Sequence, residues 1–309
     1  GHTGDLYDRK AAQDALLETP YEAFTAMPSG DTSVVDTILE ELKNNVYRAA
    51  QDAQVLSFDP SLTYPFTFQD EVEGRVLDVS GLKEKIYQMV STLESGDVEI
   101  VPDVITPSVT VAELKQNYAM RASVYTPIDR HSTDNRNNNI RRCFEKINGY
   151  VLAPGYKFSF NSVVGKRTLA NGFYEAIEYA YGEHVMGVGG GSCQASTTLY
   201  QAVVEANLTI NTRVPHSDSV SYASYGEDAT VSWTTGRKID LAFTNSTSHD
   251  LYFVAAVETD PSNSKRLIAR VTIYGEAIEA GVRYELQSQT IQTISAPSDP
   301  TYVKDKDAE

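Results

Sequence analysis

The 309-residue sequence has little cysteine, little basic charge and no long apolar run, and each shortage excludes a class of protein. Two cysteines, Cys143 and Cys193, cannot build a disulfide framework or a four-thiolate zinc site. With 26 basic residues against 42 acidic ones, the net charge of −16 repels nucleic-acid phosphates and anionic lipid. No segment approaches the roughly 18 consecutive apolar residues of a membrane helix. With 41% hydrophobic and 22% charged residues, the chain has the composition of a globular protein.

The start of the chain lacks the charged and apolar pattern of a signal peptide. The residues Gly1-His2-Thr3-Gly4 are typical of the remnant of an expression tag. We therefore expect that a native signal or anchor segment has been removed ahead of them.

The acidic charge is concentrated in the first third of the chain. Residues 1–105 carry 20 acidic and 7 basic side chains, and residues 106–309 carry 22 and 19, so the net charges are −13 and −3. A stretch with two prolines, Val101–Pro107, lies at this change. The sequence thus predicts two domains, 1–105 and 106–309, of which the first is strongly acidic. Its expected helices and strands are Val34–Leu42, Leu82–Val90, Ala53–Phe58 and Phe66–Gln69.

The second domain is expected to combine helices with strands before it turns largely to β structure. Helices are predicted at Asn139–Ile147, after a polar Asn-rich loop, and at Gln194–Ala206, directly after Cys193. The strands expected here are Met120–Thr126, Leu208–Val214, Thr230–Thr234, Ile239–Phe243, Leu251–Val257, Arg266–Tyr274 and Tyr284–Ile294. The predicted fold class is α+β: an α+β N-terminal domain, then a mixed catalytic domain with a cysteine-bearing helix and a largely antiparallel β C-terminal part.

The most distinctive motif is a glycine-dense loop that leads directly into the second of these helices. It contains Gly190, Gly191 and Ser192, and it puts Cys193 in the first helical turn, where free N–H groups and the helix dipole favour a thiolate. The same N–H groups would form an oxyanion hole for acyl transfer. The alternatives are an anion-binding loop, although the dinucleotide and P-loop patterns are incomplete, and a buried structural cysteine. The density of glycines favours a nucleophilic Cys193.

A thiolate nucleophile needs a base, and the chain has five histidines. His184 and His216 are both within reach of Cys193, and His216 is favoured because a proline just before it ends the predicted strand. Asp228 is the first candidate for the group that orients the imidazole, and Asp240 is the second. A zinc site from the two histidines and Cys193 matches no common ligand spacing, so no metal and no cofactor are expected.

Residues 130–170 carry eight basic and two acidic side chains, in contrast to the rest of the chain. Such runs are most often solvated helix faces, but this one is also a candidate rim for substrate carboxylates, with Arg142 and Arg167 as direct contacts. Tyr200, Tyr222 and Tyr225 are candidates for the lining of a groove. Cys143 fits the apolar side of a helix and is predicted to be core.

Residues from about Val109 to Val257 resemble the VanW domain, which is named after a component of vancomycin-resistance clusters in Gram-positive bacteria. The matching blocks include Ile147-Asn148-Gly149, Phe158-Ser159-Phe160-Asn161, Gly189-Gly190-Gly191-Ser192-Cys193-Gln194, Pro215-His216-Ser217, Asp228-Ala229-Thr230-Val231 and Asp240-Leu241. The resemblance implies a cell-envelope protein that faces the wall and is tethered by an N-terminal membrane segment. Some VanW-domain proteins are understood to be L,D-transpeptidases, and the family's cysteine and histidine fall on Cys193 and His216. The first domain, 1–105, contains Ala53, Val55, Phe58, Pro65-Phe66, Glu71, Gly74 and Leu77-Asp78. Through these residues it resembles the peptidoglycan-binding module often found ahead of such domains, which implies a peptidoglycan-binding or spacer domain.

The sequence therefore leads to the hypothesis of an extracellular cysteine-dependent L,D-transpeptidase that joins peptidoglycan stem peptides by 3-3 cross-links. Its partners would be stem peptides and not nucleic acid. In this hypothesis Cys193 is the nucleophile, His216 the base and Asp228 the orienting group, and the loop backbone holds the oxyanion. Two alternatives stay open: an L,D-carboxypeptidase, and a non-catalytic peptidoglycan-binding accessory protein in antibiotic resistance.

Overall fold

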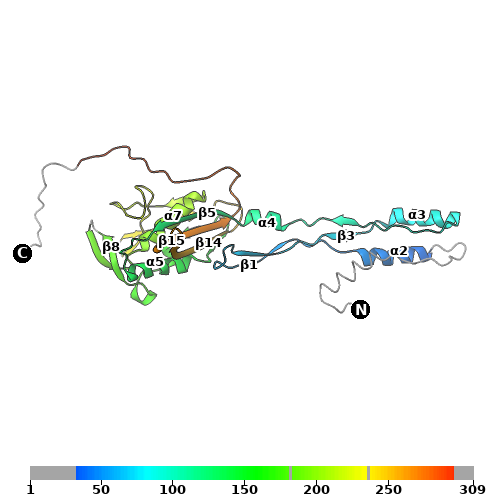
Figure 1. The fold of residues 1–309 in the computed structure, drawn as a ribbon, viewed down its shortest axis with the longest axis horizontal. Coiled ribbons are helices and arrows are strands. Elements are labelled where there is room, and N and C mark those ends of the chain that lie inside the picture. Colours follow the sequence, from blue (N-terminus) through cyan, green and yellow to red (C-terminus); the bar gives the residue numbers. More distant parts are fainter. Residues whose placement is uncertain (1–32, 181–182, 235–236, 296–309) are drawn as a thin grey trace, which may run out of the picture. The chain divides into compact units, whose positions relative to one another are not determined.

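The computed structural model describes residues 33–180, 183–234 and 237–295 (Figure 1). Contacts between residues divide the chain into two compact units. The units are Gly1–Asn117 and Tyr118–Glu309, so the division lies later than the predicted 105/106. The contacts of Asp52 explain the difference. Its carboxylate accepts the N–H groups of Ser108 and Val109, at 2.6 and 3.0 Å, and these two bonds tie the segment after residue 105 to the first unit.

The first unit contains two helices packed on each other and two short antiparallel ladders. Its elements are α2 (Ser33–Val46), β1 (Gln54–Phe58), β2 (Phe66–Gln69), β3 (Gly74–Val76), α3 (Val79–Thr92), β4 (Asp103–Ile105) and α4 (Val111–Asn117). Strand β1 pairs with β2, and β3 pairs with β4. A small core of Val35, Leu39 and Ile86 joins α2 to α3. The helices and strands expected for this unit are confirmed in type and place.

The second unit is built around antiparallel sheets and two long helices. Its elements are β5 (Ala119–Pro127), α5 (Asp134–Ile147), β6 (Val151–Leu152), β7 (Lys157–Ser159), α6 (Phe160–Val164), η1 (Leu169–Asn171), β8 (Glu175–Ala180), β9 (Glu183–Val188), α7 (Ser192–Glu205), β10 (Thr209–Thr212), β11 (Ser232–Thr234), β12 (Arg237–Ile239), β13 (Ala242–Thr244), β14 (Leu251–Asp260) and β15 (Asn263–Gly275). Every strand pair in the described residues is antiparallel. The α+β fold class is confirmed.

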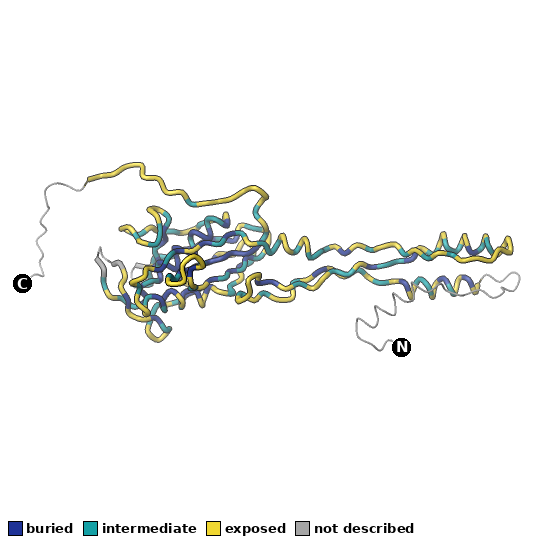
Figure 2. The backbone as a smooth tube through the Cα atoms, in the orientation of Figure 1, coloured by how far each residue is buried: buried dark blue, intermediate teal, exposed yellow. Residues whose placement is uncertain are grey.

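A four-stranded sheet in the order β5-β15-β14-β6 carries the core of this unit. Its register sets Phe253 opposite Ile273, and Ala255 opposite Val271, so that alternate residues of neighbouring strands point to one face. Helices α5 and α7 pack on the sheet and on each other. Their buried apolar side chains and the four sheet residues just named belong to one hydrophobic cluster. Figure 2 shows that the deeply buried stretches gather along these helices and strands, whereas the backbone of the first unit is mostly exposed or half-buried.

Aromatic rings join this sheet to a smaller one in the order β10-β13-β7. Phe158 of β7 stacks on Phe243 of β13, with ring centroids 4.8 Å apart, and both lie within 6.0 Å of Phe253 of β14. All three side chains are fully buried. The ring cluster therefore joins the two sheets into one core.

Three sequence predictions for the second unit were wrong at the level of single elements. The predicted strand Ile239–Phe243 is interrupted between β12 and β13, because Asp240 instead accepts the N–H of Asn161. The Asn-rich stretch expected as a loop forms the first turns of α5, because Thr133 caps the helix at Arg136 N (3.2 Å) and Asn139 is buried with backbone partners. The predicted strand Tyr284–Ile294 is not formed, and Ile291 and Ile294 are 92% and 82% exposed. In the described part of the chain this segment pairs with no strand, so its alternating apolar side chains have no sheet face to pack against. No helix in the described ranges is long and apolar enough to cross a bilayer.

The ring cluster yields a test of where the folding free energy lies. Replacing Phe158 with Ala should destabilise the second unit by about 3–5 kcal/mol, the usual cost of removing a buried ring. The control is Tyr156→Ala, because Tyr156 is an aromatic residue two positions earlier with 69% of its surface exposed. Guanidinium unfolding followed by the fluorescence of Trp233, the single tryptophan, reports on this unit alone. Equal losses in the two variants would contradict this assignment of the core.

Candidate active site

The glycine loop before α7 is shaped by close packing against its neighbours. A Cβ on Gly190 would lie 2.6 Å from the carbonyl oxygen of Ile177 in β8, so no side chain fits there. Gly191 has a φ of +107°, in the region that favours glycine, and its backbone lies against Arg136 of α5. Asn139 holds the loop, since its amide donates to the carbonyl oxygen of Gly190 at 2.9 Å. The loop is therefore a fixed platform for the start of α7.

Ser192 closes this platform from the inside. Its hydroxyl donates to the carbonyl oxygen of Gly189 at 2.7 Å, and its own N–H donates to the same oxygen at 3.0 Å. The thiol of Cys143 lies 3.6 Å from the Ser192 hydroxyl. The side chain and the N–H group of Ser192 are thus both engaged within the protein, which leaves the expected oxyanion role to its neighbours.

The two cysteines lie in different environments. Cys193 is half-buried in the first turn of α7, lines an open groove, and has its sulfur 3.5 Å from the carbonyl oxygen of Val231. Cys143 is fully buried on α5, and burial raises its pKa to about 11. The core position predicted for Cys143 is confirmed, and of the two thiols only that of Cys193 faces the groove.

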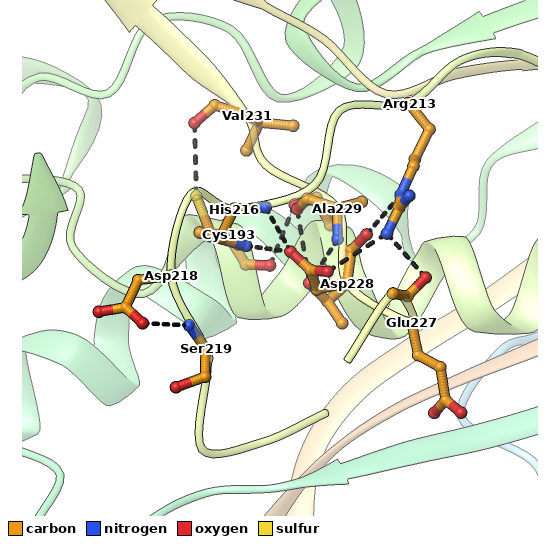
Figure 3. Close-up of polar contacts among 12 residues, drawn as sticks. Cys193, Arg213, His216, Asp218, Ser219, Glu227, Asp228, Ala229 and Val231 are labelled. Carbon is orange, nitrogen blue, oxygen red and sulfur yellow. Dashed lines mark hydrogen bonds and ion pairs between the residues drawn. The ribbon is translucent and has the colours of Figure 1, made fainter. Parts of the chain in front are cut away.

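His216 and Asp228 form a tight pair beside Cys193 (Figure 3). The ring Nδ1 of His216 is hydrogen-bonded to Oδ2 of Asp228, and the backbone N–H of His216 donates to the same oxygen at 2.6 Å. Both side chains are more than nine-tenths buried. The carboxylate therefore holds His216 both at its backbone N–H and at its ring.

The electrostatics of the pair favour an imidazolium next to a carboxylate. Burial lowers the pKa of His216, but hydrogen bonds to Asp228 and Cys193, together with the negative charge of both partners, raise it to about 9. Burial raises the pKa of Asp228, but its hydrogen bonds with His216 outweigh that effect and lower it. An imidazolium in contact with a thiol stabilises the thiolate. A Cys–His pair of this kind is the chemistry of a nucleophile with its acid–base partner.

Side chains of helix α7 also form hydrogen bonds with the separate segment in which Asp228 lies. The hydroxyl of Ser196 donates to the carbonyl oxygen of Ala229 at 2.6 Å, and the Thr197 hydroxyl accepts the N–H of Ala229 at 3.0 Å. One turn later, the amide of Gln201 donates to the carbonyl oxygen of Glu227 at 3.1 Å. The helix that positions Cys193 therefore positions the partner of its histidine as well.

The groove beside Cys193 has a volume of about 1340 Å³ and lies entirely in the second unit. Besides the glycine loop and His216, its lining includes the cationic side chains of Arg136, Lys166 and Arg167. Arg167 donates to Asn161 Oδ1 at 2.6 Å, and Arg136 lies over the ring of Tyr222 at 6.0 Å. Burial raises the pKa of Tyr222, so its phenol stays protonated at neutral pH. Three acidic side chains, Asp129, Glu178 and Asp218, line the same groove, so its lysine and arginine cations are matched in number by carboxylates and it is not a purely basic rim.

Besides Asp228, which pairs with His216, and Tyr225, which is 76% exposed, three of the predicted site residues lie outside the groove lining, and one cannot be placed. Arg142 pairs with Glu145 and donates to the carbonyl oxygen of Asn171, which makes it a support of α5. Asp240 accepts hydrogen bonds from the hydroxyl of Ser159 and from the N–H of Asn161, and so caps the start of α6. These bonds connect it to α6 and not to His216.

Tyr200, the third, packs under the guanidinium of Arg213 at 5.1 Å instead of lining the groove. The side chain of His184 lies outside the described residues, as do the side chains at the tip of the β8–β9 hairpin. Among the described residues no group of three or more His, Cys, Asp or Glu side chains is placed to hold a metal ion.

Sequence reasoning missed Arg136, Arg213, Ser196, Thr197 and Gln201. A signal for three of them is present, because α7 combines polar residues with an apolar stripe, and polar residues on a buried helix need partners. Nothing in the sequence marks Arg136 and Arg213 among the other arginines. Only the folded structure distinguishes them, because it brings Arg136 against the glycine loop and Arg213 against Asp228.

The different environments of the cysteines predict selective alkylation. Iodoacetamide should label Cys193 in the folded protein, because it faces the groove beside an imidazolium, and should leave Cys143 unlabelled, because that thiol is buried with a raised pKa. Peptide mapping by mass spectrometry gives the two extents, and the same reaction in denaturant provides the fully labelled control. Comparable rates at both cysteines in the folded protein would contradict the arrangement.

The raised pKa of His216 predicts a pH dependence with a definite sign. NMR titration, with the signal assigned through His216→Gln, should give a midpoint near pH 9. A group whose pKa is higher in the folded state stabilises the fold fully below its ordinary value, here 6.5, and loses that contribution as the pH rises through the folded-state pKa. The wild type should therefore lose stability between pH 6.5 and about 9 relative to His216→Gln.

The exposed His249 supplies the control, because His249→Gln should leave both the titration and this difference in stability unchanged. A His216 midpoint at or below 6.5 would contradict the interactions described for the pair.

Comparison with known proteins finds a relative and a family model that match this chain. The uncharacterized protein YoaR of Bacillus subtilis (strain 168) is 35% identical over 220 residues, which are 69% of this chain and 69% of YoaR. No solved structure matches the chain. A family model described as VanW like protein matches residues 135–265, a region that spans α5, the glycine loop, Cys193, His216 and Asp228. The residues of the candidate site thus all lie in the part that is shared, and the chain belongs to the family of VanW-like proteins.

Proposed function

We propose that this protein is a cysteine acyltransferase that acts on peptidoglycan stem peptides as an L,D-transpeptidase. The observation that carries the proposal is the series Cys193–His216–Asp228, which ends in a thiol at the wall of an open groove. A nucleophile, a base in contact with it and a group that orients the base are the parts of a covalent acyl-transfer site. Stem peptides lie outside the cell membrane, so the proposal includes an extracellular location at the wall.

In the first half-reaction the thiolate of Cys193 attacks the carbonyl carbon of the diamino acid at position three of the donor stem. A C–S bond forms, and the C–N bond to the terminal D-alanine breaks. With a pKa of about 9, His216 is protonated at neutral pH and gives its proton to the departing amine. The products are a thioester on Cys193, free D-alanine and a neutral His216.

In the second half-reaction the side-chain amine of the third residue of a neighbouring stem attacks the thioester. The neutral His216 takes the proton of that amine as the new C–N bond forms. The C–S bond breaks, which restores the thiolate of Cys193 beside a protonated His216. Asp228 holds the ring in one orientation through both steps, and the net result is a 3-3 cross-link.

The candidate donors to the oxyanion are backbone N–H groups at the start of α7. Those of Ser192, Gln194 and Ala195 already donate to carbonyl oxygens of the loop. We assign the oxyanion to the neighbouring N–H groups of Gly190, Gly191 and Cys193. A donor of this kind contributes about 3–4 kcal/mol to the transition state in other acyl transferases.

Three cations of the groove are candidate partners for the carboxylates of a stem peptide, and they lie among the acidic side chains Asp129, Glu178 and Asp218. Stem peptides carry carboxylates at their D-amino acids and at their end, and Arg136, Lys166 and Arg167 lie along the groove that contains Cys193. These cations stand in a chain of net charge −16. We include the first unit in the proposal as the part that binds peptidoglycan or spaces the second unit from the membrane.

Intact-protein mass spectrometry tests the proposal directly. After incubation with a disaccharide-tetrapeptide, the protein should gain the mass of the donor minus one D-alanine, and acceptor stems should remove the adduct. Cys193→Ala should abolish the adduct, and His216→Ala should slow its formation roughly 10²–10⁴-fold, the range for a positioned acid–base group. The matched histidine control is His249→Ala, which should form the adduct at the wild-type rate because His249 is exposed.

The soluble products separate the possible functions. Dimers joined between third residues identify a transpeptidase, and tripeptide with D-alanine but without dimers identifies a carboxypeptidase. Binding of the stem peptide with no release of D-alanine, across pH and donor chemistry, would overturn the enzymatic proposal in favour of a binding module.

A further inference from the structure

Arg213 lies directly after β10 and makes three contacts with the turn that carries Asp228. Its Nε donates to the carbonyl oxygen of Asp228 at 2.7 Å, and its Nη2 donates to the carbonyl oxygen of Gly226 at 2.7 Å. The same Nη2 lies 3.2 Å from Oδ1 of Asp228. Figure 3 shows the guanidinium on the side of Asp228 that faces away from His216. One side chain thus binds both the main chain and the carboxylate of this residue.

The carboxylate of Asp228 is consequently held at both oxygens. Oδ2 accepts from the ring and the backbone of His216, and Oδ1 accepts from Arg213. A carboxylate with one bound oxygen can rotate about its Cβ–Cγ bond, whereas one with both oxygens bound has its plane fixed. Because Asp228 is the partner of the His216 ring, the plane of the carboxylate sets the position of the imidazole.

Arg213 also connects this turn to the helix that bears Cys193. Its guanidinium lies 5.1 Å from the ring centroid of Tyr200, which projects from α7. Its side chain is only 20% exposed, so water screens these contacts weakly. The segment of His216, the turn of Asp228 and helix α7 therefore meet at one guanidinium.

We propose that Arg213 is a positioning residue, which holds the Asp228 carboxylate and thereby the His216 imidazole in place beside Cys193. The proposal deepens the proposed acyl transfer, but it concerns the geometry of the pair and can be tested without any substrate. The planar fork of a guanidinium is needed because its contacts reach two carbonyl oxygens and a carboxylate at once, which a lysine ammonium on a flexible stem cannot reproduce.

A positioning role and a charge effect predict opposite shifts of the His216 titration. The positive charge of Arg213 by itself disfavours the imidazolium, so a pure charge effect would raise the His216 midpoint in Arg213→Gln. Loss of positioning weakens the bond between His216 and Asp228 and lowers the midpoint instead. The other titratable groups near the ring, Cys193 and Tyr222, are unchanged in the variant.

The experiment is NMR titration of His216 in the full chain, in the wild type, Arg213→Gln and Arg213→Lys. Both variants should move the midpoint down from about pH 9, by about one pH unit or more, which corresponds to a tenfold change in proton affinity. Lysine keeps the charge but loses the fork, so a fall in Arg213→Lys separates positioning from charge. The rate of Cys193 alkylation at neutral pH should fall in the same two variants.

The matched control is Arg270→Gln. Arg270 also pairs with a carboxylate, Glu258, and lies over a ring, Tyr125 at 5.1 Å, but it belongs to β15, outside the groove lining. This variant should leave the His216 midpoint and the alkylation rate as in the wild type. A midpoint that stays at the wild-type value in folded Arg213→Gln, or that rises, would overturn the proposal.

Discussion

The buried carboxylate of Asp228 is the constraint on which the arrangement of this site depends. An ionised carboxylate removed from water costs several kcal/mol unless its oxygens are paired and hydrogen-bonded. Here the backbone and ring of His216 meet one oxygen and Arg213 meets the other. Each of these donors must stay in place for the charge to remain buried. The fold therefore cannot satisfy Asp228 without also fixing the imidazole, and the acid–base geometry follows from the need to compensate a charge.

Helix α7 can serve this pair because it packs with two different faces. Its apolar stripe, which includes Leu199 and Val203, belongs to the core beneath the four-stranded sheet. Its hydroxyls at Ser196 and Thr197 are fully buried, yet they bond to the backbone beside Asp228. A buried hydroxyl without a partner would cost about 1–3 kcal/mol, so these residues specify the position of the Asp228 segment on the helix. The rigid core is in this way coupled directly to the groove.

How much of this the sequence could predict depended on the distance over which each signal acts. Periodicity located α7 and the long strands to within a few residues, since helix and strand patterns are local. The start of α5 was missed because Asn-rich segments usually form loops, and only the distant backbone partners of Asn139 reverse that preference. The choice between Asp228 and Asp240 stayed open for the same reason. Both precede apolar residues in similar contexts, and only the folded chain shows that Asp240 caps α6 while Asp228 meets His216.

The glycine loop was correctly predicted to lie at the candidate site, but its glycines are there for a different physical reason than the one predicted. The density of glycines suggested a backbone shaped for a ligand, but Gly190 is required by the carbonyl oxygens of β8, and Gly191 by its positive φ and by the backbone of α5. The loop would need these residues even if nothing ever bound there. The feature that points to function is therefore the surroundings of Cys193 and not the glycines. Packing alone does not require a thiol at the groove wall beside an imidazole that is paired with a carboxylate, whereas acyl transfer by a cysteine uses such a pair.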